Sequence, residues 1–295
     1  GGCDYYDRCS IFSFSSHQGA RLREGGLSLK AENISIRRGD RLIVEGISFT
    51  VHSGQFLAIA GVNGSGKSTV LGGLSGELTL ATGTIEIAGV SLENWDLKSL
   101  AKRRAVLLQD SDLSFPFSVL DVVLMGRSAY NSGLETARDL EVTHAALARV
   151  GLADFAERRY TTLSGGERQR VHLARVLAQV WPDEDDVNND VVVRYLFLDE
   201  PTASQDLAAQ HRVLSSAREF ADQGGVVVAV LHDLNQVAQY ADRVLLLSDG
   251  QTAGLGPPSK VLVPDMLEKV YGVRIEVIDY PGIDYPLIVS CRGSG

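Results

Sequence analysis

The sequence predicts an α/β fold with a largely parallel sheet, and three observations lead to this prediction. A short apolar run at residues 56–60 lies between two glycines, as expected of a fully buried parallel strand. From Val191 onward, strand-sized apolar runs alternate with helical patterns, which is typical of a parallel α/β sheet. Between Gln109 and Tyr160 the pattern is helical instead, so this block is expected to form an inserted helical subdomain.

Local patterns predict the other elements. Residues 29–36 and 44–51 each alternate apolar and polar side chains, and Arg38-Gly39-Asp40 between them is a turn sequence. These two runs are therefore expected to form an antiparallel β-ribbon. The remaining expected elements, in chain order, are helix 69–74, strand 85–89, helices 97–104, 119–125 and 140–150, strand 191–198, helix 207–222, strand 226–231, helix 234–241 and strand 244–247.

Composition argues against several classes of function. The 295-residue chain has a net charge of −9, so it has no general electrostatic attraction for nucleic acid and we expect no such partner. No run approaches the roughly 18 consecutive apolar residues of a membrane-spanning helix, because even the strongest, at 226–231, is only strand-sized. Cys3, Cys9 and Cys291 are too widely separated to indicate a disulfide framework or a zinc site, and a reducing cytosol fits them best.

A phosphate-binding loop follows the first buried strand. Residues 61–69 read GVNGSGKST and fit the pattern G-x-x-x-x-G-K-[ST], with a strand before and a helix after, so we expect ATP to bind here. Lys67 is expected to reach the β and γ phosphates and Ser68 to ligate Mg²⁺. The expected ATP-binding residues of this loop are Gly61, Asn63, Gly64, Ser65, Gly66, Lys67, Ser68 and Thr69. The fold prediction thereby narrows to a P-loop NTPase (RecA-like) core with an antiparallel β subdomain and an inserted α-helical subdomain.

Two further stretches carry chemistry. The apolar run 195–198 delivers Asp199 and Glu200 at the end of a strand, where ligands bind in open α/β sheets. Asp199 is expected to hold Mg²⁺ together with Ser68, and Glu200 to polarise the water that attacks the γ phosphate. Ser164 can cap a helix that begins with Gly165 and Gly166, which makes a second anion cradle. Because the chain already has one complete phosphate loop, a second cradle indicates ATP sandwiched between two chains.

The sequence LSGGERQR at 163–170, combined with the phosphate loop and LFLDE at 196–200, resembles the ATPase subunits of ABC transporters. The resemblance implies that Gln109 contacts Mg²⁺ and the attacking water, and that His232 contacts the γ phosphate. Residues 204–206 occupy the D-loop, with Gln205 where the family usually has leucine. The implied catalytic residues are Glu200, His232 and Gln109; the implied metal ligands are Ser68, Gln109 and Asp199; and the implied second ATP cradle consists of Ser164, Gly165, Gly166 and Glu167.

The resemblance also implies partners. A second copy of the chain would complete a head-to-tail ATP sandwich, and two transmembrane permease subunits would hold the chain at the cytoplasmic face of the inner membrane, with a substrate-binding protein acting indirectly. Residues 109–127 are the candidate permease-contacting face, although Phe115 and Phe117 could equally pack in an ordinary core.

Arg37 and Arg38 stand where the family often has an adenine-stacking aromatic residue, and we hypothesise that an arginine stacks on the base.

Four segments narrow the resemblance to the haem (hemin) importer ATPases of the HmuV type. They are RAVLLQ at 104–109, FPFSV at 115–119 together with VVLMGR at 122–127, ARVLAQVWP at 174–182 and VYGV at 270–273. Ferric-siderophore and cobalamin importers share much of this pattern and stay open as alternatives, as does an exporter. A regulatory module would be expected to lack Glu200, and an ABC protein acting on ribosomes or DNA would need a second ATP-binding half or a long coiled-coil insertion.

The predicted domain organisation has three parts. Residues 1–26 form a flexible N-terminal extension, residues 27–250 form the ATPase domain, and residues 251–295 form a C-terminal extension packed on the core. The helical subdomain is expected within the ATPase domain, at about residues 110–180.

Overall fold

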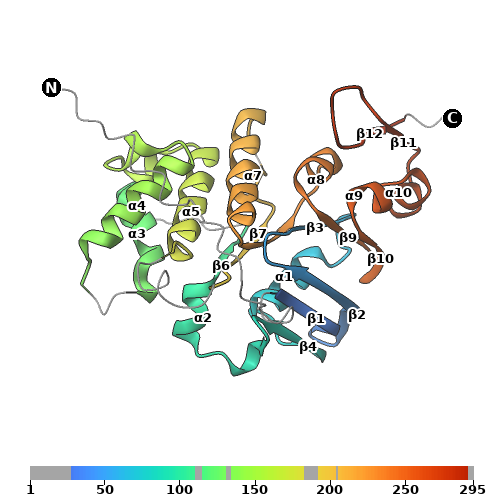
Figure 1. Cartoon of the computed structure of the whole chain (residues 1–295), viewed down its shortest axis with the longest axis horizontal. Coiled ribbons are helices and arrows are strands. Elements are labelled where there is room, and N and C mark those ends of the chain that lie inside the picture. The colour runs from blue at the N-terminus through green and yellow to red at the C-terminus, as the bar shows by residue number, and fades with distance from the viewer. Residues whose placement is uncertain (1–27, 110–114, 131–133, 183–191, 204, 292–295) are drawn as a thin grey trace, which may run out of the picture.

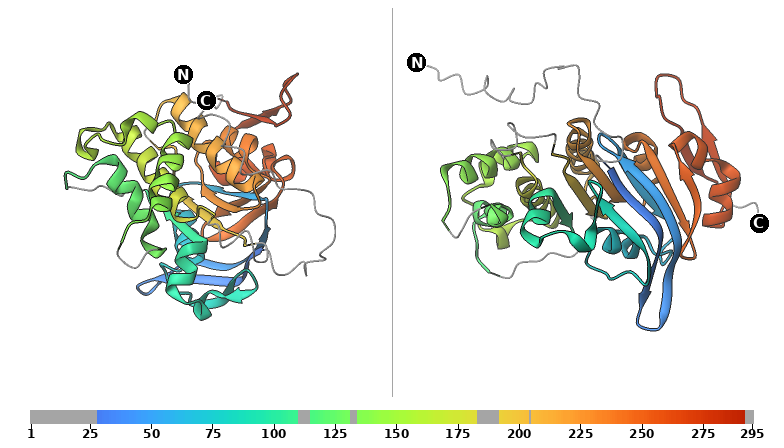
Figure 2. Two further views of the ribbon diagram at one scale, coloured as in Figure 1. Left: turned by 60° about the vertical axis from the view of Figure 1, so that its left-hand side comes forward. Right: turned by 60° about the horizontal axis from the view of Figure 1, so that its bottom comes forward.

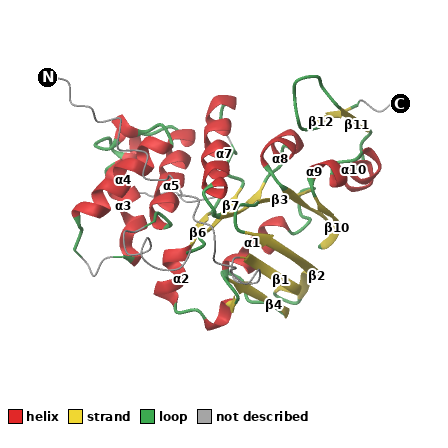
Figure 3. Cartoon of the chain, in the orientation of Figure 1, coloured by secondary structure: helices red, strands yellow, loops and turns green. Residues whose placement is uncertain are grey.

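The structure is a computed structural model, and it describes the chain except for residues 1–27, 110–114, 131–133, 183–191, 204 and 292–295. The predicted flexible extension at 1–26 therefore lies outside the described residues. Figure 1 shows a helical part on the left, a mixed core in the centre and a β-rich part at the lower right. Figure 3 shows the same division by secondary structure.

The core is a six-stranded sheet in the order β10-β9-β3-β8-β7-β6. Five of its strands run parallel to their neighbours, and β10 pairs antiparallel with β9. The strands are β3 (Phe56–Gly61), β6 (Arg104–Leu107), β7 (Tyr195–Asp199), β8 (Val226–Val230), β9 (Arg243–Ser248) and β10 (Gln251–Gly256). Every residue of β3, β7 and β8 is buried, which explains their continuous apolar sequences. The predicted α/β fold with a largely parallel sheet is confirmed.

A second, antiparallel sheet has the order β2-β1-β4-β5. Its strands are β1 (Ser28–Arg38), β2 (Arg41–His52), β4 (Thr82–Ile87) and β5 (Val90–Ser91). Helix α1 (Lys67–Ser75) contacts strands of both sheets, and the apolar faces of β1 and β2 form one core cluster with residues of β3, β7 and α1. The β-ribbon predicted around Gly39 is present as the antiparallel pair β1 and β2, and both of its strands contact the helix that follows the phosphate loop.

The helical subdomain contains α3 (Val119–Leu124), the 3-10 helix η2 (Met125–Ala129), α4 (Ala137–Arg149) and α5 (Gly165–Gln179). Ser118, Thr136 and Ser164 each begin a helix with a capping box, in which the serine or threonine side chain and an acidic side chain three residues later each accept a backbone hydrogen bond. The sequence left open whether Phe115 and Phe117 contact a permease or pack in the core. Phe117 is half-buried against the core, whereas Phe115 is 69% exposed.

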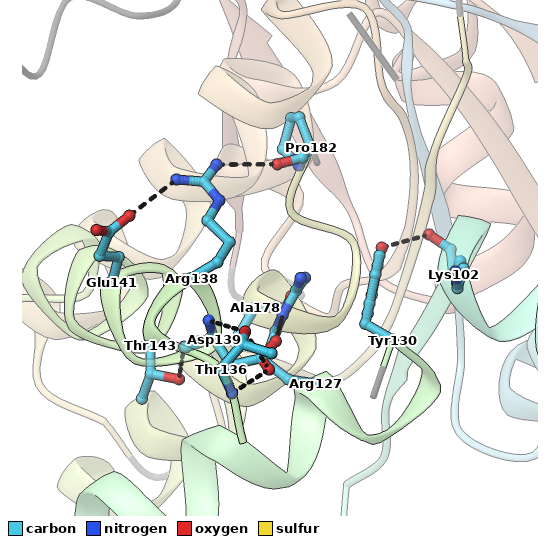
Figure 4. Close-up of polar contacts among 10 residues, drawn as sticks. All are labelled: Lys102, Arg127, Tyr130, Thr136, Arg138, Asp139, Glu141, Thr143, Ala178 and Pro182. Carbon is cyan, nitrogen blue, oxygen red and sulfur yellow. Dashed lines mark hydrogen bonds and ion pairs between the residues drawn. The ribbon is translucent and has the colours of Figure 1, made fainter. Parts of the chain in front are cut away.

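A buried arginine joins the helices of this subdomain to one another (Figure 4). Arg127 of η2 is 1% exposed, forms an ion pair with Asp139 of α4 at 3.0 Å, and donates to the Ala178 carbonyl of α5 at 3.0 Å. Its guanidinium also lies 3.7 Å from the centre of the Tyr130 ring. Burial raises the pKa of the Asp139 carboxyl, but hydrogen bonds from Thr136 and Arg127 outweigh burial and hold that pKa below its usual value.

Ten further elements complete the described part of the chain. They are η1 (Leu92–Asn94), α2 (Leu97–Arg103), η3 (Ala153–Phe155), η4 (Tyr160–Thr162), α7 (Leu207–Asp222), α8 (Leu234–Tyr240), α9 (Pro258–Val261), α10 (Pro264–Tyr271), β11 (Ile275–Ile278) and β12 (Leu287–Ser290). The hairpin of β11 and β12 projects from the body on the side away from the helical subdomain (Figure 2). None of the helices in the described ranges is both long and apolar enough to span a bilayer.

Three details differ from the sequence prediction. The strand expected from Val191 begins at Tyr195, because the neighbouring strands β6 and β8 begin opposite that residue. The helix expected at 97–104 ends at Arg103, because Arg104 begins strand β6, and Leu100 alone of that helix is buried. Strand β10 pairs with β9, so the core sheet continues past the domain boundary predicted at residue 250.

Candidate functional site

The loop between β3 and α1 needs glycine at two positions for steric reasons. Gly66 has φ +99°, and a Cβ there would lie 3.0 Å from Val44 Cγ2. Gly61 has φ +143°, and a Cβ there would lie 2.3 Å from the Leu247 carbonyl oxygen. These backbone conformations are unfavourable for residues with side chains, so the sequence pattern permits the sharp turn from strand to helix. Helix α1 then begins directly after Gly66.

A buried cation follows this turn. Lys67 is 5% exposed, and its Nζ donates to the carbonyls of Gly61 and Val62, both at 2.9 Å. Burial lowers the pKa of Lys67, and the nearby carboxylates of Glu200 and Asp199 oppose that shift. The buried Ser65 hydroxyl has no hydrogen-bond partner among the described residues. The loop thus offers a desolvated positive charge and a free polar group to an anion.

A carboxylate faces the start of α1 from the end of β7. The Ser68 hydroxyl donates to Asp199 Oδ1 at 3.1 Å. Burial raises the pKa of Asp199, and the hydrogen bond from Ser68 opposes that shift. In the described part of the chain, no group of three or more His, Cys, Asp or Glu side chains could hold a metal ion alone. A hydroxyl beside one carboxylate suits Mg²⁺, which binds proteins through one or two carboxylates and takes its other ligands from phosphates and water.

Three polar side chains meet at the carboxyl ends of neighbouring strands. Glu200 Oε1 lies 2.6 Å from Nε2 of His232, and Glu200 Oε2 accepts a hydrogen bond from Gln109 Nε2 at 3.0 Å. The three residues follow β7, β8 and β6, which are adjacent in the sheet. Glu200 itself has φ +49°, a left-handed conformation that is uncommon for a residue with a side chain. The tertiary structure therefore brings together the three residues that the sequence assigns to catalysis.

A cavity of about 640 Å³ connects this trio to the phosphate loop. Its lining residues are Arg38, Ile43, Asn63, Gly64, Gly66, Lys67, Ser68, Thr69, Gln109, Glu200 and His232. Gly61, Ser65 and Asp199 are absent from the lining; Gly61 and Ser65 belong to the same loop, and Asp199 bonds Ser68. Ile43 was not predicted, because alternation in a β-ribbon does not tell which of its side chains will face a distant loop.

The two candidate base-stacking arginines differ in position. Arg38 lines the cavity, whereas Arg37 does not and instead donates to the Asp40 carbonyl at 3.0 Å within its own turn. An arginine at the cavity rim can stack its planar guanidinium on an aromatic base. The sequence hypothesis of base stacking is therefore narrowed to Arg38.

The predicted second cradle lies outside this cavity. Ser164 and Gly165 are exposed at the N-terminus of α5, and none of Ser164, Gly165, Gly166 and Glu167 lines the cavity. The Glu167 carboxylate accepts hydrogen bonds from the amide and the hydroxyl of Ser164, at 2.7 and 2.8 Å, which lower the pKa of Glu167. Its role in this chain is that of a helix cap, and contact of Glu167 with ATP stays a prediction.

Comparison with known proteins agrees with this geometry. The ABC transporter family matches residues 44–203. The hemin import ATP-binding protein HmuV of Gloeobacter violaceus is 47% identical over 261 residues, which cover 88% of this chain and 93% of that protein. The chain belongs to the ABC transporter family. A protein of the same name from Pseudomonas aeruginosa is 45% identical and covers 89% of this chain and 99% of its own length.

Solved structures of ABC transporters share the fold. One, described as of the metal-chelate type in an inward-facing conformation, is 29% identical with a TM-score of 0.74, covering 90% of this chain and 98% of its own. A bacterial Atm1-family ABC exporter with ATP bound is 26% identical with a TM-score of 0.68, covering 85% of this chain and 42% of its own. Because ABC transporters of different types share this fold, the fold alone does not determine the direction of transport.

Proposed function

We propose that this chain is the ATP-hydrolysing subunit of an ABC importer that energises haem (hemin) uptake through a partner permease. The observation that carries the ATPase assignment is the cluster of Glu200, His232 and Gln109 facing the phosphate loop across one cavity. A module that only binds nucleotide has no need of a carboxylate held beside the γ-phosphate position.

In the proposed reaction, the chain's own groups position ATP and the attacking water. Lys67 moves from its loop carbonyls onto the β and γ phosphates, which gives its buried charge a stronger partner. Ser68 and Asp199 would hold Mg²⁺, which would neutralise phosphate charge when bound. Glu200 polarises water for in-line attack and His232 contacts the γ phosphate, while Gln109 would contact both the metal and the water.

Hydrolysis in this proposal requires two copies of the chain. The helix N-terminus at Ser164, Gly165 and Gly166 presents the positive end of the helix dipole, with the Ser164 amide bonded to Glu167, and it lies outside the cavity of its own chain. A head-to-tail dimer would place this cradle over the γ phosphate held by the other copy. ATP binding and release would then drive two permease subunits, which would hold the chain at the cytoplasmic face of the inner membrane, with a substrate-binding protein acting indirectly.

The cargo assignment rests on relatives and not on a haem site in this chain. The relatives named above are hemin import proteins. A ferric siderophore or cobalamin is the alternative cargo. The similarity to a solved ABC transporter described as of the metal-chelate type supports this alternative.

Growth of a deletion strain tests the cargo. The strain is supplied with haem, a ferric siderophore or cobalamin as the only source of the limiting nutrient, and complemented with the parent chain or with Lys67→Ala. We expect the deletion strain to stop growing on haem and to keep growing on the siderophore and on cobalamin. The parent chain should restore growth on haem, and Lys67→Ala should not. If the deletion strain grows on haem but fails on the siderophore or on cobalamin, that nutrient is the cargo instead of haem, and the ATPase assignment is unaffected.

A further inference from the structure

The backbone turn that carries Glu200 is held by an unusual set of side chains. Its three consecutive carbonyls, those of Glu200, Pro201 and Thr202, each accept a hydrogen bond from a different glutamine amide. Gln169 of α5 donates to Glu200 at 3.1 Å, Gln205 donates to Pro201 at 3.0 Å, and Gln210 of α7 donates to Thr202 at 3.3 Å.

The glutamines also bond to one another and reach the helix that follows His232. Gln205 Nε2 donates to Gln169 Oε1 at 3.0 Å, and Gln210 Nε2 donates to the Gln205 carbonyl at 3.2 Å. Gln236 of α8, which is 6% exposed, donates to Gln210 Oε1 at 2.8 Å and accepts from the Thr202 hydroxyl at 3.2 Å. A continuous hydrogen-bonded path thus runs from α5, through the turn after Glu200, to α8.

This path matters because Glu200 has left-handed backbone geometry, with φ +49°. Such a conformation is unfavourable for a residue with a Cβ and persists only where its surroundings hold it. If the turn relaxed, the carboxylate would turn away from His232 Nε2, which now lies 2.6 Å from Glu200 Oε1. None of the glutamines of this path lines the nucleotide cavity, so we expect them to act through the position of Glu200 and not through direct contact with ATP.

We propose that Thr202, Gln210 and Gln236 are positioning residues that hold the Glu200 turn against the helix following His232. They thereby keep the Glu200 carboxylate and the His232 imidazole in place relative to each other and to the γ phosphate. The inference rests on the proposed ATPase function and deepens it. It predicts a selective loss of turnover, because a small misplacement of a catalytic group slows the chemical step without removing any contact to ATP.

The test compares glutamine-to-methionine variants of the full-length chain. Gln210→Met and Gln236→Met keep side-chain length but remove the hydrogen bonds. Gln179→Met is the matched control, because Gln179 also donates to two backbone carbonyls, those of Ala101 and Arg104, but at the junction of α5 with α2. ATP hydrolysis is measured at protein concentrations where the rate per chain no longer rises, together with ATP affinity and thermal stability.

We expect kcat to fall about 10- to 100-fold in Gln210→Met and Gln236→Met, with KM and ATP affinity within about twofold of the parent chain. The double variant should be no slower than the slower single variant, because both changes break one path. The control should keep kcat within about twofold. Unchanged kcat in both variants, equal loss in the control, or loss that follows ATP affinity would overturn the proposal.

A second pair keeps the test decisive where a methionine variant fails to fold. Thr202→Ser keeps the hydroxyl that bonds Gln236, whereas Thr202→Val replaces it with a methyl group of similar size. We expect near-parent kcat in the serine variant and the reduced kcat in the valine variant; equal rates in the two would reject the proposal. Glu200→Gln is measured alongside to separate failure of the proposed catalytic role of Glu200 from failure of the positioning proposal. If Glu200→Gln hydrolyses ATP at the parent rate, the catalytic assignment fails, whatever the positioning variants do.

Discussion

Glu200 Oε1 lies 2.6 Å from Nε2 of His232, although the two residues are more than thirty positions apart in the chain. They meet because β7 and β8 are adjacent parallel strands and each residue follows the carboxyl end of its strand. Gln109 approaches Glu200 from the end of β6 on the other side. This arrangement places the proposed base, the proposed γ-phosphate contact and the proposed metal contact at one edge of the sheet.

Glu200→Gln should bind ATP but hydrolyse it about 100- to 10,000-fold more slowly, because the amide cannot accept a proton from water. The variant should accumulate as an ATP-bound dimer, measured by size-exclusion chromatography with light scattering. The same variant without ATP serves as the control and should not accumulate as this dimer. Full turnover would show that another group is the base.

Asp199→Asn should weaken Mg²⁺-dependent ATP binding and yet stabilise the ligand-free chain at pH 7. Burial raises the pKa of Asp199 above the ordinary value of 3.8, so the folded state holds the proton more tightly than the unfolded state. The charged carboxylate therefore costs stability at pH 7, and this cost disappears as pH falls through the folded pKa toward 3.8. Urea unfolding across this range should show the advantage of the asparagine variant shrinking. A variant less stable than the parent at pH 7 would contradict this reasoning.

Arg38→Ala should weaken ATP binding about two- to fivefold, the size expected for loss of one exposed cation–π contact. Arg37→Ala is the matched control, because Arg37 is bonded to its own turn and does not line the cavity. Titration with ATP and with inorganic triphosphate separates base contact from phosphate contact, and only ATP binding should change. Equal affinities in the two arginine variants would remove Arg38 from the site.

Arg127→Met should destabilise the chain by about 3–5 kcal/mol, because it leaves the Asp139 carboxylate buried without its charged partner. Arg138→Met is the comparison, since Arg138 pairs with the exposed carboxylate of Glu141 and should contribute only about 0–1 kcal/mol. The measurement is the free energy of unfolding in urea. If Arg127→Met lowers the free energy of unfolding by no more than about 1 kcal/mol, the Arg127–Asp139 pair in Figure 4 is not a main support of the subdomain.

Phe115→Ala should leave ATP hydrolysis by the isolated chain unchanged but reduce transport when the permease is present. Phe115 is 69% exposed within the predicted permease-contacting face, whereas Phe117 packs against the core and would mix folding with docking. Leu97→Ala, at a side chain that is 82% exposed on α2, is the control for loss of exposed apolar area. Intact transport in Phe115→Ala, measured in vesicles with both subunits, would place the docking surface elsewhere.

The features that sequence alone could predict are local ones. The glycine pattern of residues 61–66 predicted a phosphate loop, and Gly61 and Gly66 do have backbone conformations that favour glycine. The continuous apolar run of β3 indicated a buried parallel strand, and Ser164 with Glu167 closes the capping box that its spacing allows. The role of Glu200 was predicted from its place at the end of an apolar strand, whereas the roles of His232 and Gln109 came from family resemblance. Nothing local to the three residues showed that they would meet.

Tertiary structure decided every feature that depends on residues distant in the chain. It selected Arg38 over Arg37 at the cavity, added Ile43 to its lining, and extended the core sheet with β10. It also linked Gln169, Gln205, Gln210 and Gln236 behind Glu200. Sequence periodicity reports which side chains are buried, but the order of parallel strands decides which buried or catalytic groups become neighbours, and that order is set by long-range packing.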